Sequence, residues 1–145
     1  MKYTSEIVID RPINRVIELF DNPENLKEWM DGLVSFECIS GVPGQVGAKS
    51  RLVFKMGKGE MEMIETITVR NLPDEFTGTY EAKGVFNIVK NTFVVISENK
   101  TKYTTEQEFQ FYGFMKIIGL LLPGMFKKQS MKYLVDFKKF VEKTS

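Results

Sequence analysis

The chain has 145 residues, 43% of them hydrophobic and 27% charged, which is typical of one soluble domain that can bury its own core. Its 20 basic and 19 acidic side chains give a net charge of +1, so it lacks the concentrated positive field of a nucleic-acid-binding protein. The absence of histidine and the single cysteine exclude a histidine-dependent catalytic triad, an internal disulfide, and a zinc site built on imidazole or several cysteines.

One strand and two short helices are predicted at the start of the chain. Residues 3–10 alternate polar and apolar side chains, which indicates a strand. They lack the continuous apolar stretch of a signal peptide, so a cytoplasmic location is expected. Asp10 and Pro12 mark the start of a helix that ends near Asp21, and Asn22 can cap a second, shorter helical piece.

Six further strands are predicted in the middle of the chain. Alternating runs, or runs rich in β-branched and aromatic residues, are separated there by glycine, proline and asparagine turns. Because the connections are short, neighbouring strands are expected to pair antiparallel. The predicted strands cover residues 33–40, 48–56, 60–71, 76–82, 85–97 and 103–111.

The chain closes on a helical segment predicted from about Phe114 to Lys143. Residues 115–122 are apolar on nearly all sides, and Pro123 and Gly124 then interrupt the pattern. Beyond them, apolar residues recur at spacings of three and four with lysines mainly on the opposite side, which predicts an amphipathic helix. A sheet this long followed by a single long helix is expected to curl around it, an arrangement that tends to leave a cavity.

Packing and turn residues of the chain form a pattern shared with a known group of proteins. The pattern includes Gly47 before the third predicted strand, a turn at residues 71–76, and a lysine-rich terminal helix after a glycine-containing linker. In the first 30 residues it consists of Ile9, Pro12, Val16, Asp21 and Trp29. With these features, essentially the whole chain resembles the START-like (SRPBCC) superfamily, which includes polyketide cyclases and dehydrases, lipid-transfer domains and the birch-pollen allergen.

The resemblance implies an α+β helix-grip fold in a single domain over residues 1–145. In this fold a seven-stranded antiparallel sheet wraps around a long C-terminal helix, and two short helices lie between the first and second strands. It also implies a deep apolar cavity, because members of the superfamily mostly bind or carry hydrophobic molecules such as lipids, quinones or polyketides. A minority are enzymes, chiefly cyclases and aromatases, and no catalytic residue set carries over to this chain.

Twelve residues are candidates for contact with a ligand, because the alternation places most of them on the inward faces of strands or of the last helix. Methionine adapts its shape to irregular partners, so a sheet face rich in methionine suits variable ligands. Plain core packing explains the same apolar residues equally well. The candidates are Phe54, Met56, Met61, Met63, Glu65, Phe76, Tyr80, Tyr103, Gln107, Phe109, Leu134 and Phe137.

Glu65 is the sharpest polar candidate, because it interrupts an otherwise apolar face between Met63 and Ile67. A carboxylate there loses water, so its neutral form is favoured unless a cation or hydroxyl pairs with it. It could orient a ligand hydroxyl or act as an acid or base. Alternatively, a β-bulge turns it away from the cavity, or this end of the cavity is wet.

Three classes of function are compatible with the sequence. The leading hypothesis is a non-catalytic carrier or sensor of a hydrophobic small molecule, with no cofactor or metal, acting as a monomer or weak dimer. The alternatives are a cyclase- or dehydratase-type enzyme that uses Glu65 and a tyrosine, and a protein-interaction module like the chaperone-activating branch of the superfamily.

The apolar segment 115–126 suggests a second activity. It could form a lid, a dimer contact or a transient membrane contact, and Lys116, Lys127 and Lys128 would favour an anionic surface. The alternative is that the segment folds over the cavity and is buried there.

Overall fold

A computed structural model describes residues 1–144 and shows one seven-stranded antiparallel sheet in that range, in the order β1-β7-β6-β5-β4-β3-β2. The helix-grip prediction is therefore confirmed. Helical segments between β1 and β2 are α1 (Ile13–Phe20), a 3-10 turn η1 (Pro23–Asn25) and α2 (Leu26–Trp29), and α3 (Met115–Leu121) and α4 (Pro123–Lys143) follow the sheet. The strands are β1 (Lys2–Ile9), β2 (Leu33–Ser40), β3 (Lys49–Met56), β4 (Gly59–Asn71), β5 (Glu75–Ala82), β6 (Val85–Ser97) and β7 (Lys100–Phe111).

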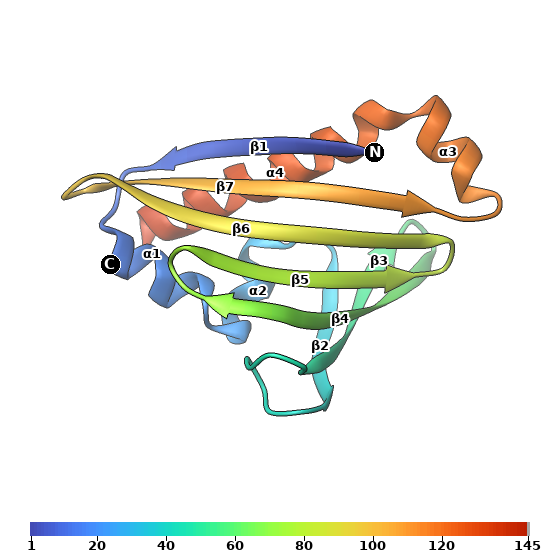
Figure 1. Ribbon diagram of the computed structural model, residues 1–145, viewed down its shortest axis with the longest axis horizontal. Helices are drawn as coiled ribbons and strands as arrows, with labels where there is room; N and C mark the ends of the chain where they lie inside the picture. The colour runs from blue at the N-terminus through green and yellow to red at the C-terminus, as the bar shows by residue number, and fades with distance from the viewer. Residues whose placement is uncertain (145) are drawn as a thin grey trace.

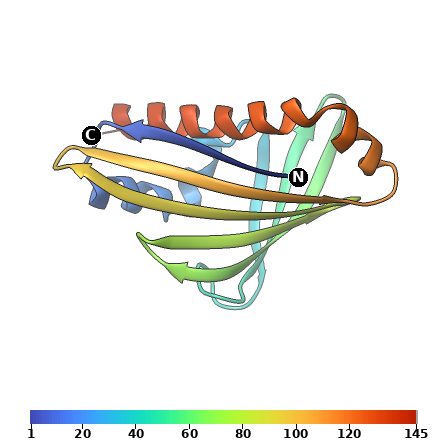
Figure 2. The same cartoon turned by 45° about the horizontal axis from the view of Figure 1, so that its top comes forward.

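The sheet curves so strongly that its two ends lie at different angles to α4. Strands β1, β7, β6, β5 and β4 follow one another across Figure 1, while β2 and β3 turn away steeply behind them. In Figure 2, α4 runs along β1, and β5 and the final part of β4 lie well away from the helix on the other side of the curve. The helix packs mainly on β1 and α2. We use the term concave face for the side of the sheet that looks toward α4.

The short helices begin and end where the sequence predicts. Asn22 caps η1 by accepting a hydrogen bond from the backbone N–H of Glu24 at 3.0 Å, and the side chain of Asn25 donates to the carbonyl of Leu19 at 3.1 Å. These contacts satisfy backbone groups that helix ends leave without a partner. They hold α1 and α2 so that Trp29 is buried against α4.

Two clusters of buried side chains join the sheet to the helices. The main core links α1, α2 and α4 to β1, β6 and β7, and its members Val16, Phe93 and Phe137 are at most 2% exposed. A second, smaller core lies at β2 and β3 around Leu52 and Phe54. Between the two cores, some side chains of the concave face are only half-buried, and we call this set the half-buried stretch: Met61, Met63, Glu65, Tyr80, Gln107 and Phe109.

A β-bulge interrupts β4, but it does not move Glu65. The register shifts between Ile67 and Val69, and the extra residue, Thr68, donates its hydroxyl proton to the carbonyl of Thr77 at 3.2 Å. Because the bulge lies two residues beyond Glu65, alternation keeps this carboxylate on the concave face.

The bulge also brings Arg70 to the concave face. Arg70 pairs with Phe76 in the ladder, and its guanidinium lies 6.0 Å from the centre of the Phe76 ring. The same guanidinium donates two hydrogen bonds to the carboxylate of Asp21, at 2.8 and 2.6 Å, just after α1. Bidentate pairs of this kind are strong and directional, so Arg70 fastens α1 to β4.

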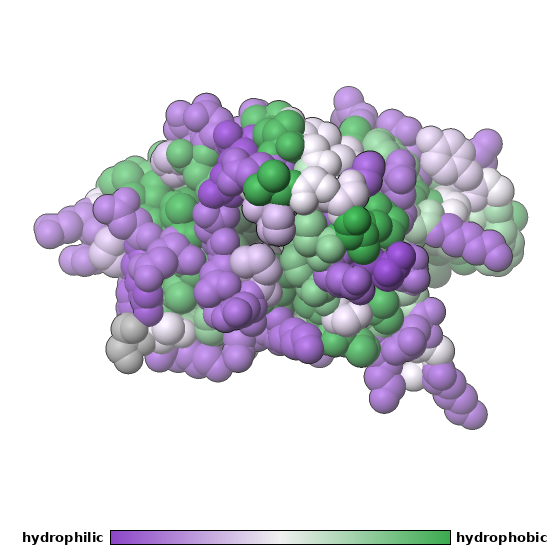
Figure 3. All heavy atoms as spheres, turned by 90° about the horizontal axis from the view of Figure 1, so that it is seen from below, coloured by the Kyte–Doolittle hydropathy of each residue, from purple (hydrophilic) through white to green (hydrophobic). Residues whose placement is uncertain are grey.

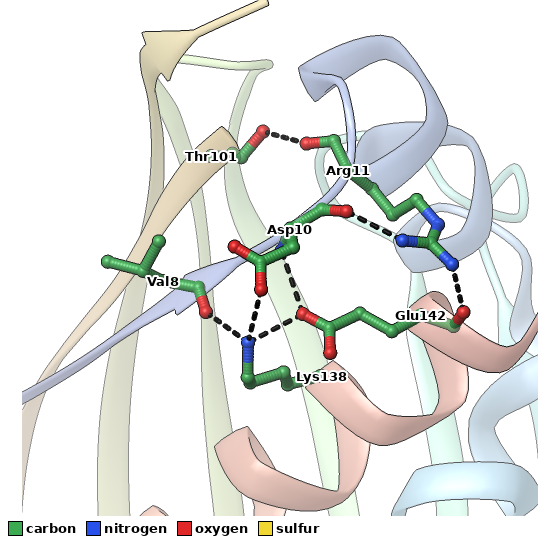
Figure 4. Close-up of polar contacts among 6 residues, drawn as sticks. All are labelled: Val8, Asp10, Arg11, Thr101, Lys138 and Glu142. Atoms are coloured by element: carbon green, nitrogen blue, oxygen red, sulfur yellow. Dashed lines mark hydrogen bonds and ion pairs between the residues drawn. The ribbon is translucent and has the colours of Figure 1, made fainter. Parts of the chain in front are cut away.

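The C-terminal end of α4 is bound to β1 by a cluster of polar contacts shown in Figure 4. Lys138 Nζ donates to the carbonyl of Val8 at 2.7 Å and to Glu142 Oε2 at 2.5 Å. Glu142 Oε2 also accepts from the backbone N–H of Asp10 at 2.7 Å, and the carbonyl of Glu142 accepts from the guanidinium of Arg11. The end of the long helix is therefore held where β1 leads into α1.

Over the described range, the protein has no helix that is both long and apolar enough to cross a membrane.

Candidate ligand-binding face

The strand register places one row of side chains across the concave face. Residues directly opposite each other in antiparallel strands project from the same side of the sheet. The ladder pairs connect each member of the row to the next, from β3 through β4, β5 and β6 to β7. The row consists of Ser50, Glu65, Tyr80, Asn87 and Phe109. Four of its five members are polar, which is unusual for a surface that faces the interior.

Glu65 and Tyr80 form a hydrogen bond within this row. Tyr80 Oη donates to Glu65 Oε2 at 2.7 Å. Burial raises the pKa of Glu65, and the hydrogen bond from Tyr80 opposes that rise without cancelling it. Burial, the charge of Glu65 and the shared hydrogen bond together raise the pKa of Tyr80 well above its ordinary value. Tyr80 therefore keeps its proton and acts as the donor of the pair.

The second oxygen of this carboxylate, Glu65 Oε1, accepts no hydrogen bond from the described residues. Met61, Met63 and Tyr80 lie around Glu65 on the same face, and all four side chains remain half-buried. An acceptor that projects from an apolar wall and retains accessible surface is suited to a ligand that carries one polar hydrogen.

A second polar cluster joins the concave face to the start of α4. Ser130 of α4 accepts a hydrogen bond from Gln107 Nε2 at 2.8 Å, and its hydroxyl lies 2.5 Å from that of Tyr3. Tyr3 Oη also donates to the carbonyl of Phe126 at 3.0 Å, and Asn87 Nδ2 donates to Gln107 Oε1 at 3.3 Å. Gln107 is thus a bridge between sheet and helix, and it forms one end of the half-buried stretch.

Four of the predicted ligand residues lie in the packed cores. Tyr103, Leu134 and Phe137 are at most 3% exposed in the main core, and Phe54 belongs to the second core. The Tyr103 hydroxyl donates to Asn91 Oδ1 at 2.7 Å, which satisfies its polar group inside the protein. These side chains fill the two packed cores on either side of the half-buried stretch.

The other predicted residues divide between the half-buried stretch and its margins. Met61, Met63, Glu65 and Tyr80 lie together on it, with Gln107 and Phe109 at the side nearer α4. Phe76 is half-buried near α1, edge-on to Phe20 at a centroid distance of 5.7 Å. Met56 ends β3 and is 58% exposed at the β3–β4 hairpin.

Asn87 and Thr105 are polar members of the concave face that are not among the predicted ligand residues. Thr105 is 4% exposed, and its hydroxyl is buried without a hydrogen-bond partner in residues 1–144. β6 is apolar on both faces, so its register could not be chosen from hydropathy alone. Asn87 and Asn91, four residues apart in that apolar strand, are the signal that identifies its inward side.

Two hollows lie elsewhere on the surface. One of about 240 Å³ lies between α1 and the β4–β5 turn and is lined by Ile13, Asn14, Ile17, Leu72 and Pro73. The other, about 770 Å³, is open along the outer side of α4 between Met125 and Lys139. Neither contains a predicted ligand residue. Within residues 1–144, no group of three or more histidine, cysteine, aspartate or glutamate residues could hold a metal ion.

Comparisons with known proteins identify the fold. No protein-family model matches the chain, and no curated protein sequence matches it either. Among solved structures, a conserved protein from Geobacillus kaustophilus has 18% sequence identity and a TM-score of 0.81, over 99% of this chain and 96% of that protein. The ZhuI aromatase/cyclase from Streptomyces sp. R1128 has 10% identity and a TM-score of 0.80, over 98% and 93% of the two chains.

A plant enzyme has the same architecture. Norcoclaurine synthase from Thalictrum flavum, in complex with dopamine and hydroxybenzaldehyde, has 14% identity and a TM-score of 0.75, and the match covers 100% of this chain and 88% of that protein. Similarity of this extent at such low identity establishes the common architecture. The chain therefore has the same helix-grip fold as these solved structures.

Proposed function

We propose that the chain binds a hydrophobic small molecule against the half-buried stretch of its concave face. The observation that carries the proposal is the oxygen Glu65 Oε1, which accepts no hydrogen bond from residues 1–144 and lies in a wall formed by Met61, Met63 and Tyr80. Fold-level similarity to an aromatase/cyclase and to a synthase that binds dopamine and hydroxybenzaldehyde supports a small, largely apolar ligand.

The chemistry of the wall indicates which ligands fit best. Methionine side chains rearrange readily, so the apolar part of the ligand can vary in shape. Ionised Glu65 accepts a hydrogen bond, and in its protonated form it donates one. A ligand with an apolar body and a single hydroxyl or amine therefore satisfies both parts of the site, whereas a pure hydrocarbon offers no hydrogen bond to Glu65 Oε1.

A direct test compares two molecules of the same shape, 2-naphthol and 2-methylnaphthalene. We expect 2-naphthol to bind more tightly by isothermal titration calorimetry, because its hydroxyl can donate to Glu65. The Glu65→Gln variant should lose about fivefold of the affinity for 2-naphthol, since a hydrogen bond to a charged acceptor exceeds a neutral one by ~1 kcal/mol. Its affinity for 2-methylnaphthalene should not fall.

The matched control is Glu60→Gln, which removes a carboxylate from an exposed position of the same strand. It should bind both compounds like the wild type. If neither compound perturbs the NMR signals of the Met61 and Met63 methyl groups, and the purified protein carries no extractable hydrophobic molecule, the proposal is wrong and the protein-interaction alternative gains support.

An enzymatic role is a second candidate, favoured by the hydrogen bond between Glu65 and Tyr80. A carboxyl group with a raised pKa beside a protonated tyrosine is an arrangement suited to general acid–base catalysis. Cyclisation or dehydration of a polyketide-like substrate would use Glu65 as the proton acceptor and Tyr80 as a donor to a carbonyl. Under this hypothesis Glu65→Gln abolishes turnover and leaves substrate binding nearly intact, and retained turnover removes Glu65 from the mechanism.

A further inference from the structure

The helix α3 and its flanks expose a continuous set of large apolar side chains. Phe114 is 72% exposed, Leu120 80% and Leu121 68%. We call the whole set the α3 patch: Phe114, Ile117, Leu120, Leu121, Leu122 and Met125. The expectation that segment 115–126 is buried over the cavity is therefore wrong for most of its large side chains. In Figure 3, apolar atoms are visible at the right-hand end of the molecule, where α3 lies, beside hydrophilic ones.

The attachment of α3 explains why the patch faces outward. Gly119 lies so close to Phe111 that a β-carbon there would be 2.5 Å from its ring. Met115 lies against Gly84 of the β5–β6 turn, where an added β-carbon would be 2.8 Å from the Met115 side chain. Residues four apart share one side of a helix, so this side is fixed to the sheet. Ile117, Leu120 and Leu121 consequently point away from it.

The charges that flank the α3 patch in the sequence are all of one sign. Residues 109–135 include four lysines and no acidic residue, so the other residues, with 16 basic and 19 acidic side chains, have a net charge of −3. Lys116, Lys127 and Lys128 lie next to the patch in sequence, and Lys83 precedes the glycine that contacts Met115. The lysines nearest the patch are exposed and form no ion pair within residues 1–144: Lys83, Lys116, Lys127 and Lys128.

We propose that the α3 patch docks on an anionic lipid surface, with its apolar side chains among the acyl chains near the headgroups and its lysines against the lipid phosphates. Exposed apolar residues beside unpaired lysines are what such a surface attracts. A second copy of the chain fits less well, because a symmetric dimer through the patch would bring lysines against lysines. The docking does not depend on the proposed small-molecule site.

The test is flotation of the protein with vesicles. We expect it to bind vesicles of equimolar phosphatidylcholine and phosphatidylglycerol, and to bind pure phosphatidylcholine at least tenfold more weakly. The Leu120→Ser, Leu121→Ser variant should lose most of the binding. Replacing Lys116, Lys127 and Lys128 by glutamine should lower affinity by about fivefold per lysine at low ionic strength, and added salt should weaken the wild type in the same way.

A matched control removes two apolar side chains from a surface without the lysines. The Val42→Ser, Val46→Ser variant changes residues that are 68% and 61% exposed in the β2–β3 loop. It should bind anionic vesicles like the wild type. All variants are first compared by circular dichroism and thermal unfolding, and because Leu120 and Leu121 are exposed, their replacement should leave both unchanged.

Three results would overturn the proposal. The wild type could fail to bind anionic vesicles, or its binding could be unchanged in the Leu120→Ser, Leu121→Ser variant. Alternatively, sedimentation equilibrium could show a wild-type dimer that this variant converts to a monomer, which would assign the patch to self-association. Binding of 2-naphthol is measured on the same proteins, so failure of vesicle binding with retained naphthol binding separates this proposal from that of the small-molecule site.

Discussion

The hydroxyl of Tyr80 lies 2.7 Å from Glu65 Oε2, in a hydrogen bond between directly opposed residues of β4 and β5. The pair lies on the half-buried stretch between two packed cores, so both groups have lost much of their water without being sealed off. Desolvation favours the neutral form of each group. A change in the protonation of Glu65 would therefore alter a hydrogen bond that joins two neighbouring strands inside the protein.

Replacing Tyr80 by phenylalanine should raise the pKa of Glu65 further, because the hydrogen bond from Tyr80 is what opposes the effect of burial. The measurement is a carbon-detected NMR titration of the Glu65 carboxyl group. Tyr112→Phe is the control, since Tyr112 is exposed and bonds to Gln110 instead. An unchanged Glu65 titration in Tyr80→Phe would show that the hydrogen bond does not form in solution.

The stability of the protein should depend on pH through Glu65. Its pKa is raised in the folded state, so folding binds its proton more tightly, and the stabilisation present below the unfolded pKa is lost as pH rises through the folded pKa. Glutamine has no proton to release at this position, so the Glu65→Gln variant does not become less stable through this group as pH rises. Its free energy of unfolding in urea, relative to the wild type, should therefore increase from acidic to neutral pH.

For this pH effect the Glu60→Gln variant is again the comparison, because it removes the same charge from an exposed site of β4. It should follow the wild type across the pH range. A parallel pH dependence of wild type and Glu65→Gln would contradict the raised pKa.

Gly119→Ala should displace α3, because the new β-carbon would lie 2.5 Å from the ring of Phe111. Crowding of this kind typically costs about 1–3 kcal/mol, which exceeds the gain of ~1 kcal/mol from replacing glycine by alanine in a helix. Hydrogen exchange of the α3 amides should accelerate. In Gly124→Ala, where nothing lies within 4 Å of the added atom, exchange should be unchanged or slower.

The two buried threonines of β7 offer a matched pair of substitutions. Thr105 has a hydroxyl without a partner, so Thr105→Val should be neutral or stabilising. Thr101 is 0% exposed and donates to the carbonyl of Arg11 at 2.9 Å, so Thr101→Val should cost about 1–3 kcal/mol. Urea unfolding measures both. Equal effects of the two substitutions would show that Thr105 has a partner, such as bound water or ligand.

The sequence predicted the fold well because turns and alternation carry most of the information. Asn22 and Pro23 begin the second helical piece, and the strands lie within one or two residues of the predicted bounds, except that β7 begins three residues earlier than predicted. The alternation also placed Glu65 on the same face of β4 as Met61 and Met63, while it left open whether a bulge turns the carboxylate away. The bulge at Thr68 was not located, because nothing in its side chain or its neighbours distinguishes it from a regular strand residue.

The sequence could not separate ligand-facing side chains from core side chains. Phe54 and Phe109 have the same chemistry and both face inward, yet Phe54 is in a packed core and Phe109 belongs to the half-buried stretch. The difference comes from the elements opposite, because Leu26 and Met30 pack on the core that contains Phe54, whereas Phe109 lies against Phe126 near the start of α4. The hydropathy pattern predicts the face of the sheet on which a residue lies. It does not predict how close the helix or strand packed against that face will be.

The helix α4 is attached to β1 at both of its ends, through Tyr3 and Ser130 at the start and through Lys138 and Glu142 at the finish. A rod fixed at two points on the same strand cannot swing open on one hinge without breaking one of the attachments. If a ligand exchanges between the interior and the solvent, α4 stays in place during the exchange. Another part of the protein must then provide the entry route. The exposed β3–β4 hairpin, which lies at the same end of the molecule as α3, is the part that can provide it.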